Sequence, residues 1–366
     1  MSKILILDNF YPLQTRTSRI KHTLLPFDFE VDATLWNRNG LKIKEDETHF
    51  VYNKSANTKT KKIAGLLGYT YFIAEILKKQ KYDVIIASHW DMLLIGALLK
   101  SKNQVLIYEN LDMPTHSNTS IRKIFWGIEK LALKRTNGIL FASRFFQKFY
   151  SKKIPSMLLE NRPSVEILKG YTQKPIGDKL SIIFLGNIRY VDILKNLIKA
   201  VWENPKVSLV IKGSGLFTQE IIRFMKNHKG THENVKLDIG WYDYHKIGEY
   251  YTNFDMIWAA YPNKDFNVKH AISNKYFESL LFEKPGIFAE KTDLGDYVVT
   301  ENIGFVVDPY STIKIKTLLD TLCADHYKLV KEVKQKQAKI PKTEMFWEQE
   351  AVALKVFLKE VIKANQ

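Results

Sequence analysis

Short apolar runs alternate with longer helix-compatible segments along the first half of the chain. The runs cover residues 3 to 7, 83 to 88, 104 to 108 and 138 to 142, and the segments between them include 63 to 79 and 120 to 135. Parallel strands need a crossover connection, usually a helix, so this alternation is typical of a parallel sheet with helices on its faces. We therefore expect an α/β domain in this half.

The same pattern starts again after residues 160 to 179, a stretch rich in Pro, Gly and Lys. Apolar runs then cover 180 to 185, 207 to 211, 235 to 239 and 255 to 259, with helical patterns at 192 to 203 and 216 to 228. The segments "KILILDN" and "LSIIFLGN" look like the opening strand and turn of two similar units. Because 366 residues exceed what one core usually organises, we expect two Rossmann-like domains that face each other, at 1–165 and 166–345.

Residues 346–366 form a separate element. Their apolar positions recur at helical spacing and make one broad stripe: Phe346, Trp347, Ala351, Leu354, Phe357 and Leu358. This predicts a terminal helix that must cover an apolar surface, either on its own domain or back on the first one.

Composition and apolar run lengths bear on the cellular compartment in which the protein works. Hydrophobic residues make up 45% of the chain, and the single cysteine, Cys323, excludes an internal disulfide. The longest apolar stretch, residues 84 to 99, is interrupted by His89 and Asp91 and is too short to span a bilayer. The N-terminus enters a strand directly and lacks the long apolar region of a signal peptide. We expect a cytoplasmic protein without a transmembrane helix.

The formal net charge of +16 is concentrated in the first half. Residues 1 to 165 contain 26 Lys and Arg against 14 Asp and Glu, whereas the remainder contains 29 against 25. A basic field attracts nucleic acid, anionic lipid head groups or phosphorylated substrates, and it also serves solubility. No zinc-finger or RRM signature accompanies the charge, which argues against a nucleic-acid partner.

Three strand-end segments in the second half carry the residues expected of a phosphate site. Glycines there allow a ligand to approach the backbone, and a helix N-terminus with a nearby Arg or Lys suits a diphosphate. Each signal has a plain structural alternative, a turn glycine or a solvated lysine. The candidates are Gly186, Asn187, Arg189 and Lys195 after the first strand, Lys212, Gly213 and Gly215 after the second, and Ser273, Asn274 and Lys275 at a helix start.

Glu278 follows on the same helix, one turn beyond Asn274. A carboxylate at this place can accept hydrogen bonds from the two vicinal hydroxyls of a ribose. The alternative is an acid that only favours the early turns of a helix through the helix dipole.

The stretches "LGNIRYVDILKNLIKAV", "LVIKGSG" and "SNKYFESLLFEKPGIF" resemble the donor-binding half of GT-B-fold glycosyltransferases, most of all the retaining family-four (group 1) enzymes. The first half is similar to that family through "DVIIASHWD" and "VLIYENLD". By this resemblance Glu278 matches the second glutamate of the E-x7-E pattern, which contacts the nucleotide ribose. His270 stands where the first glutamate would hold the donor sugar, and Arg189 is expected to take the phosphate role.

The resemblance implies transfer of a hexosyl or related sugar from a nucleoside-diphosphate sugar, with retention and without a metal or another cofactor. The leaving diphosphate would be stabilised by cations and helix N-terminal amides. The phosphate candidates above and His270 complete the donor site. His89, Asp91 and Asp112 follow strands of the first domain and are candidates for holding an acceptor hydroxyl or the donor sugar, with turn or cap residues as the alternative. His89, Asp112 and Arg189 are the catalytic candidates.

Residues 120 to 135 interleave apolar side chains with Arg122, Lys123, Lys130, Lys134 and Arg135. Such a helix either lies on an anionic bilayer or packs as an ordinary helix with one buried face. Together with the basic first half, it suggests a peripheral enzyme at the inner face of the cell membrane. Its acceptor would be a glycan, linked to polyprenyl diphosphate, in bacterial surface-polysaccharide or glycoconjugate assembly. Because of His270, a non-catalytic GT-B partner that binds a nucleotide sugar or another transferase stays open as an alternative.

Overall fold

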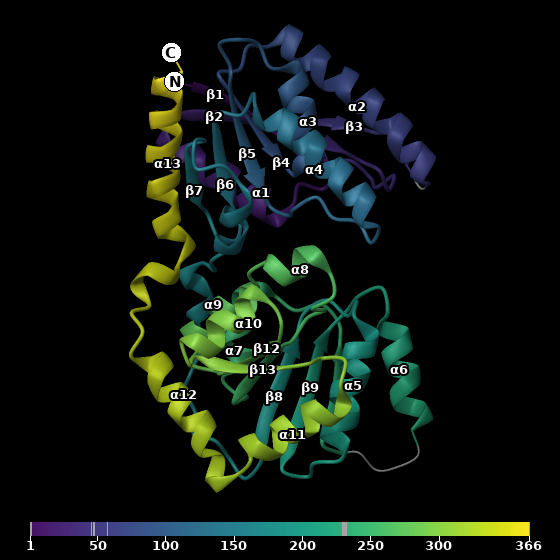
Figure 1. Ribbon diagram of the computed structural model, residues 1–366, viewed down its shortest axis with the longest axis vertical. Coiled ribbons are helices and arrows are strands. Elements are labelled where there is room, and N and C mark those ends of the chain that lie inside the picture. Colours follow the sequence, from purple (N-terminus) through teal and green to yellow (C-terminus); the bar gives the residue numbers. More distant parts are fainter. Residues whose placement is uncertain (1, 45, 47, 57, 229–232, 366) are drawn as a thin grey trace. The chain divides into compact units, whose positions relative to one another are not determined.

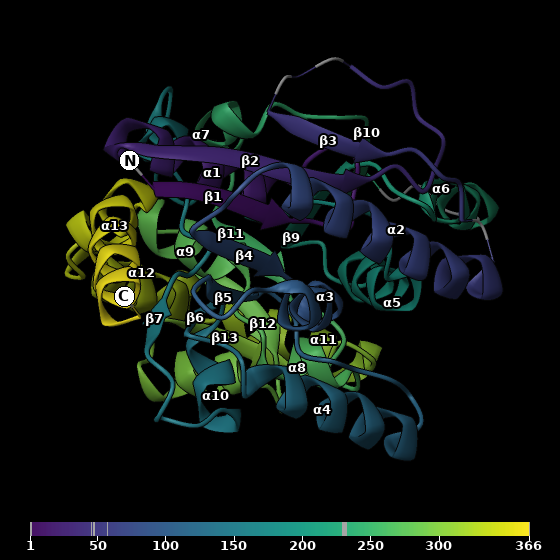
Figure 2. The same cartoon turned by 90° about the horizontal axis from the view of Figure 1, so that it is seen from above.

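The computed structural model describes residues 2–44, 46, 48–56, 58–228 and 233–365. It divides into two compact units. Unit 1 consists of Met1–Asn161 together with Gln349–Gln366, and unit 2 of Arg162–Glu348. Each unit is built on a parallel sheet with helices packed on it (Figures 1 and 2). The division between the units follows Asn161, within the Pro-, Gly- and Lys-rich stretch.

The sheet of unit 1 has seven strands in the order β3-β2-β1-β4-β5-β6-β7, and all paired neighbours run parallel. The strands are β1 (Ser2–Leu7), β2 (Phe29–Trp36), β3 (His49–Tyr52), β4 (Val84–Ser88), β5 (Val105–Asn110), β6 (Gly138–Phe141) and β7 (Ser156–Leu158).

Helices cover both faces of this sheet. They are α1 (Thr15–Leu24), α2 (Lys59–Lys79), α3 (Trp90–Leu99), α4 (Thr119–Leu133) and most of α13 (Trp347–Ala364), with short 3₁₀ helices η1 (Leu25–Phe27) and η2 (Arg144–Phe149). Helices α3 and α4 pack against each other. The terminal helix α13 (yellow in Figure 1) lies beside β6, where a Cβ built on Gly138 would come within 2.9 Å of the Phe357 ring.

The sheet of unit 2 has six strands in the order β10-β9-β8-β11-β12-β13, again with parallel neighbours. The strands are β8 (Leu180–Leu185), β9 (Val207–Gly213), β10 (Val235–Ile239), β11 (Met256–Ala259), β12 (Gly286–Ala289) and β13 (Gly304–Val307).

The helices of unit 2 connect these strands. They are α5 (Val191–Trp202), α6 (Thr218–Asn227), α7 (Ile247–Tyr251), α8 (Phe266–His270), α9 (Asn274–Leu281), α10 (Asp293–Thr300), α11 (Thr312–Leu322) and α12 (Lys328–Ala338), with 3₁₀ helices η3 (Val165–Leu168), η4 (Tyr244–Lys246), η5 (Asp325–Tyr327) and η6 (Thr343–Met345).

The continuous apolar run of β8 has a direct structural reason. Side chains alternate between the faces of a strand, and here both faces are covered. Ile182 and Phe184 belong to the core cluster with α5 and α11, whereas Ile183 and Leu185 belong to the cluster with α7 and the end of α9. Buried on both faces, β8 is apolar at every position except Ser181, whose hydroxyl donates to Asp255.

The expected α/β architecture with two parallel sheets is confirmed. The eight strands predicted from apolar runs are all present, and four predicted helices correspond to α2, α4, α5 and α6. The sequence pattern missed β2, β3, β7, β12 and β13. Four of these, β3, β7, β12 and β13, have only three or four residues, and β2 contains Glu30 and Asp32, which interrupt its apolar pattern.

Candidate functional site

Both sheets have a switch point next to their first strand. In unit 2 the chain builds outward from β8 through β9 to β10 and then returns to place β11 on the other side of β8. In unit 1, β1 lies between β2 and β4 in the same way. Ligands of open parallel sheets bind beyond the carboxyl ends of the strands at such a point. The loops after β8, β9 and β11, and those after β1 and β4, are therefore the candidate sites.

The loops after β8 and β9 are held together through their backbones. Gly186 N donates to Lys212 O at 3.1 Å, and Ile188 N donates to Ser214 O at 3.2 Å. Gly213 has φ of +140°, and a Cβ built there would lie 1.9 Å from Gly186 O. Only glycine fits this position. The structure thus brings the predicted residues Gly186, Asn187, Gly213 and Gly215 into two contacting loops, with Asn187 exposed.

Arg189 lies at the exposed end of the first of these loops. Its guanidinium is stacked over the Tyr190 ring, 4.7 Å from the centroid. Arg189 also lines a cavity of about 360 Å³ together with Tyr190, Asp192, Glu220 and Tyr310. No carboxylate lies within ion-pair distance of its guanidinium in the described residues. Arg189 is therefore a cation available to an anionic ligand.

Tyr261, two residues after β11, is partly buried by the surrounding side chains and packs edge-on against Tyr190. Burial raises the pKa of the Tyr261 phenol, and the negative charge of Glu278 acts in the same direction. A hydrogen bond with the Ser273 side chain and the positive charge of Arg189 oppose this shift. The predicted residues Arg189, Ser273 and Glu278 therefore all influence the pKa of this phenol.

Helix α9 begins where Ser273 caps it. The Ser273 hydroxyl accepts a hydrogen bond from Lys275 N at 3.2 Å, which satisfies one of the free N–H groups at the helix start. Ser273 and Asn274 are half-buried, whereas Lys275 and Glu278 are buried. Lys275 Nζ lies 2.6 Å from Glu278 Oε2 and forms a buried ion pair one turn apart. The two charges that stand out in the sequence therefore compensate each other.

The two oxygens of Glu278 have different surroundings. Oε2 accepts from Lys275 and from the buried Tyr251 hydroxyl. Oε1 is 3.4 Å from the Tyr244 hydroxyl, a long hydrogen bond. Burial, with the charge of Glu278 as a second cause, raises the pKa of Tyr251 and raises that of Tyr242 to about 12. Glu278 thus has one committed oxygen and one with acceptor capacity left beneath Tyr244.

Lys195 and Lys212, two other predicted phosphate ligands, are engaged elsewhere. Lys195 Nζ lies 2.6 Å from Glu220 Oε1 on α6. Lys212 Nζ lies 2.7 Å from Asp238 Oδ2 on β10 and 4.8 Å from the centroid of the Tyr250 ring. The structure therefore places both ammonium groups in ion pairs, and the partner of Lys195, Glu220, lines the same cavity as Arg189.

His270 ends the short helix α8 and is buried. Its Nδ1 lies 2.8 Å from Asp293 Oδ2, at the start of α10, and its ring packs edge-on against Phe266. Since the pair joins two elements that follow β11 and β12, His270 holds them together at the carboxyl edge of the sheet.

In unit 1 the candidates His89 and Asp91 lie at the switch point, and Asp112 lies farther along. His89 precedes α3 with φ of +72°, and its Nε2 is 3.3 Å from Gln14 Nε2. Asn9 Nδ2 donates to Asp91 at 2.6 Å. Asp112 is exposed in the segment after β5. The structure therefore brings His89 and Asp91 to the ends of β1 and β4.

A buried polar network that the sequence pattern did not reveal underlies His89. Asp8, directly after β1, accepts from Phe10 N and from Gln14, and burial raises its pKa. Arg16 Nε donates to Glu109 at 2.8 Å, and the Ser88 hydroxyl donates to the same carboxylate. Asp8 carried a usable signal, because it directly follows the first apolar run.

The sequence analysis also did not identify the tyrosines around Glu278. Tyr261 follows the run at 255 to 259 and could have been found as a strand-end residue. Tyr244 and Tyr251 lie in η4 and α7, 34 and 27 residues before Glu278, and local spacing gives no sign of their contact with it.

Neither a metal-ligand cluster nor a membrane-spanning helix occurs among the described residues. No group of three or more His, Cys, Asp or Glu side chains is arranged to hold a metal ion there. Among the helices of the described ranges, none combines the length and apolar character that crossing a membrane requires.

No protein-family model matches this sequence, and no curated protein does. Solved structures match it in fold. The sucrose-phosphate synthase of Thermosynechococcus elongatus superposes with a TM-score of 0.74 at 13% identity, covering 100% of both chains. Anabaena HepE in complex with UDP gives 0.70 at 15% identity, covering 99% of this chain and 100% of that one.

A third match is a galactosyltransferase of the lipopolysaccharide outer core, WaaB, in its apo form. It has a TM-score of 0.68 at 12% identity and covers 98% of this chain and 100% of that one. Such identities establish architecture alone. With two parallel α/β units and full-length matches of this kind, the chain has the GT-B fold of these glycosyltransferases.

Proposed function

We propose that the protein is a glycosyltransferase that moves a hexosyl or related sugar from a nucleoside-diphosphate sugar to an acceptor glycan with retention of configuration. The observation that carries this proposal is that the exposed Arg189, after β8, and the start of α9 with its buried Glu278 both follow strand ends at the switch point of unit 2. An available cation, a helix start and a carboxylate are the groups that a diphosphate and its ribose require.

The donor would bind with its diphosphate against Arg189 and the start of α9. Gly186, Asn187, Gly213 and Gly215 supply the backbone of the adjoining loops. The ribose would bind Glu278 through Oε1, with Tyr244 moving aside, because Lys275 and Tyr251 already occupy Oε2. In this arrangement Lys275 acts by keeping Glu278 charged and in position. The fold match to structures with bound UDP and UDP-glucose favours a UDP-sugar as the first donor to test.

The leaving diphosphate gains negative charge as the glycosidic bond to it breaks. Arg189 and the partial positive charge at the start of α9 would stabilise that charge, and they are in place before the reaction. Metal-independent transfer is the form of the reaction that the resemblance implies. Lys195 and Lys212 could also stabilise this charge, but only after their ion pairs with Glu220 and Asp238 break.

The acceptor would bind to unit 1. His89, at the switch point, and Asp112, exposed after β5, are the groups proposed to hold a reacting hydroxyl or to take its proton. The basic character of this half favours a phosphorylated, lipid-linked acceptor and a place at the inner face of a cell membrane. A role in bacterial surface-polysaccharide or glycoconjugate synthesis is proposed on this ground.

A donor panel tests the proposal directly. UDP-, GDP- and dTDP-sugars are titrated into the protein by calorimetry, and donor hydrolysis is then followed for each. We expect one nucleotide class to bind and to be hydrolysed slowly, with binding weakened by Glu278→Ala in a folded protein. A folded Glu278→Ala variant with undiminished affinity would show that the site is wrongly assigned.

The second candidate is a non-catalytic partner that binds a nucleotide sugar or another transferase. It is favoured by the engagement of His270, which stands at the family's first glutamate position and is tied to Asp293. The two candidates separate cleanly. Nucleotide-sugar binding without hydrolysis or transfer to any acceptor extract supports the partner role, whereas turnover supports the enzyme.

A further inference from the structure

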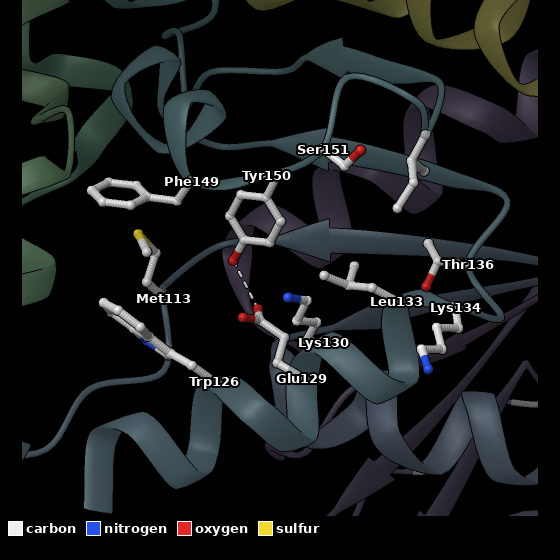
Figure 3. A pocket seen from close by; sticks show the side chains of 11 residues that line it. Met113, Trp126, Glu129, Lys130, Leu133, Lys134, Thr136, Phe149, Tyr150 and Ser151 are labelled. Carbon is white, nitrogen blue, oxygen red and sulfur yellow. Dashed lines mark hydrogen bonds between the residues drawn. The ribbon is translucent and has the colours of Figure 1, made fainter. Parts of the chain in front are cut away.

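A second pocket lies in unit 1, away from the strand ends that hold His89. It is a cleft of about 540 Å³ between α4 and residues 149 to 154, with Met113 at one end (Figure 3). Its size falls within the range of about 300 to 1,000 Å³ that is usual for small-molecule sites. Nothing proposed for the nucleotide site or for the reacting hydroxyl uses this cleft.

The walls of the cleft are mostly apolar. Trp126 and Leu133 come from α4, Phe149 and Ile154 from the facing segment, and Met113 closes one end. Trp126 Nε1 donates to Pro114 O, so its polar atom is satisfied, and its ring lines the cleft while also packing against Phe149 and the Arg122 guanidinium. These walls suit a hydrocarbon chain.

The polar group on the inner side of the cleft is the carboxyl group of Glu129. Glu129 is buried, and one of its oxygens accepts from the hydroxyls of Tyr108 and Tyr150, at 2.7 Å each. Burial raises the pKa of this carboxyl group. Because this carboxyl group borders the inner end of the cleft, an anionic head is disfavoured there and would stay at the rim.

The rim carries two exposed lysines, Lys130 of α4 and Lys134, which caps the C-terminal end of that helix. They are four residues apart and so share one side of the helix. Neither ammonium forms an ion pair with another residue in the described ranges. Two uncompensated cations therefore border an apolar cleft.

Beyond these lysines, α4 exposes a second apolar strip. Ile124 and Leu131 are 60% and 62% exposed and are seven residues apart, hence on one side of the helix. At 100° per residue, Lys130 and Lys134 lie between this strip and the side of Trp126 and Leu133. The row of charge is thus flanked by apolar surface on both sides, which is the distribution expected where a helix meets lipid.

We propose that this cleft binds a lipid phosphate, with its hydrocarbon chain between Trp126, Leu133 and Phe149 and its phosphate against Lys130 and Lys134. The proposal deepens the proposed function and rests on it in one respect, that the acceptor is lipid-linked. The cleft would hold the lipid of such an acceptor or of the membrane that carries it, and the shared chemistry is a chain with a phosphate head.

Calorimetric titration of the full chain with farnesyl phosphate, kept below its micelle concentration, tests the proposal. We expect one saturable site. Farnesol, which lacks the phosphate, should bind at least about tenfold more weakly, because it loses a charged hydrogen bond. Geranyl phosphate should also bind more weakly, since each buried methylene contributes about fourfold in affinity. Inorganic phosphate alone should not bind measurably.

Two variants locate the site. Ser151→Trp places a large ring in the cleft from its exposed side, and Lys130→Glu with Lys134→Glu reverses the charge of the rim. Each should weaken farnesyl phosphate binding by about tenfold or more. The matched control is Lys328→Glu with Lys331→Glu, which makes the same charge change on the exposed side of α12 and should leave affinity within about twofold.

The proposal is overturned if farnesyl phosphate does not bind, if both site variants bind it as the parent does, or if inorganic phosphate competes equally well. Binding to anionic phospholipid vesicles without binding of monomeric farnesyl phosphate also overturns it, in favour of adsorption on the surface of α4. UDP is titrated into the same samples. Loss of one ligand with retention of the other shows which of the two proposals has failed.

Discussion

Glu278 on α9 and Glu129 on α4 are two buried glutamates in similar surroundings with one difference. Each is covered by two tyrosine hydroxyls, Tyr251 and Tyr244 in the first case and Tyr108 and Tyr150 in the second. Glu278 also has a buried cation, Lys275, at 2.6 Å. Glu129 has no ion pair in the part of the chain that the structure describes, and burial raises its pKa.

The difference shows what each helix is suited to bind. A buried carboxylate is costly unless a cation and hydrogen bonds compensate it. Lys275 supplies the cation at α9, so the Glu278 carboxylate is held near the start of that helix, where it can accept hydrogen bonds from hydroxyl groups. On α4 the Glu129 carboxyl group has only the hydrogen bonds from the Tyr108 and Tyr150 hydroxyls. Lys130 and Lys134 remain exposed at the rim of the cleft, where they can bind an anion.

The largest expected effect comes from breaking the α9 pair. Glu278→Gln leaves Lys275 buried without a counter-ion and should lower the free energy of unfolding by about 3 to 5 kcal/mol. Glu129→Gln strands no cation and should cost about 1 kcal/mol. Urea denaturation of both variants measures the difference. Equal losses would contradict the comparison, and Lys275→Met combined with Glu278→Gln should recover much of the stability.

The next effect concerns the nucleotide rather than stability. Arg189→Ala should weaken UDP binding by about 1.5 to 3 kcal/mol, because it removes a charged hydrogen bond to the diphosphate. Arg223→Ala is the control, since it removes an exposed arginine of α6 in the same unit. Calorimetric titration of both variants with UDP decides whether Arg189 belongs to the nucleotide site. If Arg189→Ala and Arg223→Ala bind UDP equally well, Arg189 is not part of that site.

The tyrosines give a finer test of the two carboxylates. Tyr251→Phe removes a hydroxyl that donates to the charged Glu278 and should cost about 1.5 to 3 kcal/mol of unfolding free energy. Tyr150→Phe leaves Glu129 with the Tyr108 hydroxyl and should cost about 0.5 to 1.5 kcal/mol. Denaturant titration at neutral pH ranks them, and the reverse order would argue that Glu129 carries the greater negative charge.

The smallest effect is a pH dependence from Glu129. Its folded-state pKa lies above the unfolded value, so its contribution to stability is fully present below the unfolded pKa and is lost as pH rises through the folded pKa. Glu129→Gln should therefore reduce the fall in stability above about pH 4, by no more than about 1.4 kcal/mol per pH unit. Glu332→Gln on exposed α12 is the control, and identical pH profiles for Glu129→Gln and the parent would contradict the assignment.

Much of the fold followed from the sequence because the strands of a buried parallel sheet are mostly apolar. β1, β4, β8 and β9 each contain a run of at least three apolar residues, whereas β2 was missed because Glu30 and Asp32 interrupt it. The loop glycines and the cap of α9 were predicted for a similar reason, since a strand end and a helix start have local signals. Whether Lys195 and Lys212 are free for a ligand was beyond such signals, because Glu220 and Asp238 come from other elements.

By itself the sequence determined that the chain forms two α/β units with parallel sheets. It also determined which loops begin at the carboxyl ends of the strands. Both follow because apolar periodicity and turn residues act over a few neighbouring positions. Only the tertiary structure decided which charges are compensated and where a cleft opens. Tyr251 reaches Glu278 across 27 residues, and Tyr150 reaches Glu129 across 21. Burial and pairing of a charge depend on such distant contacts, and no local pattern encodes them.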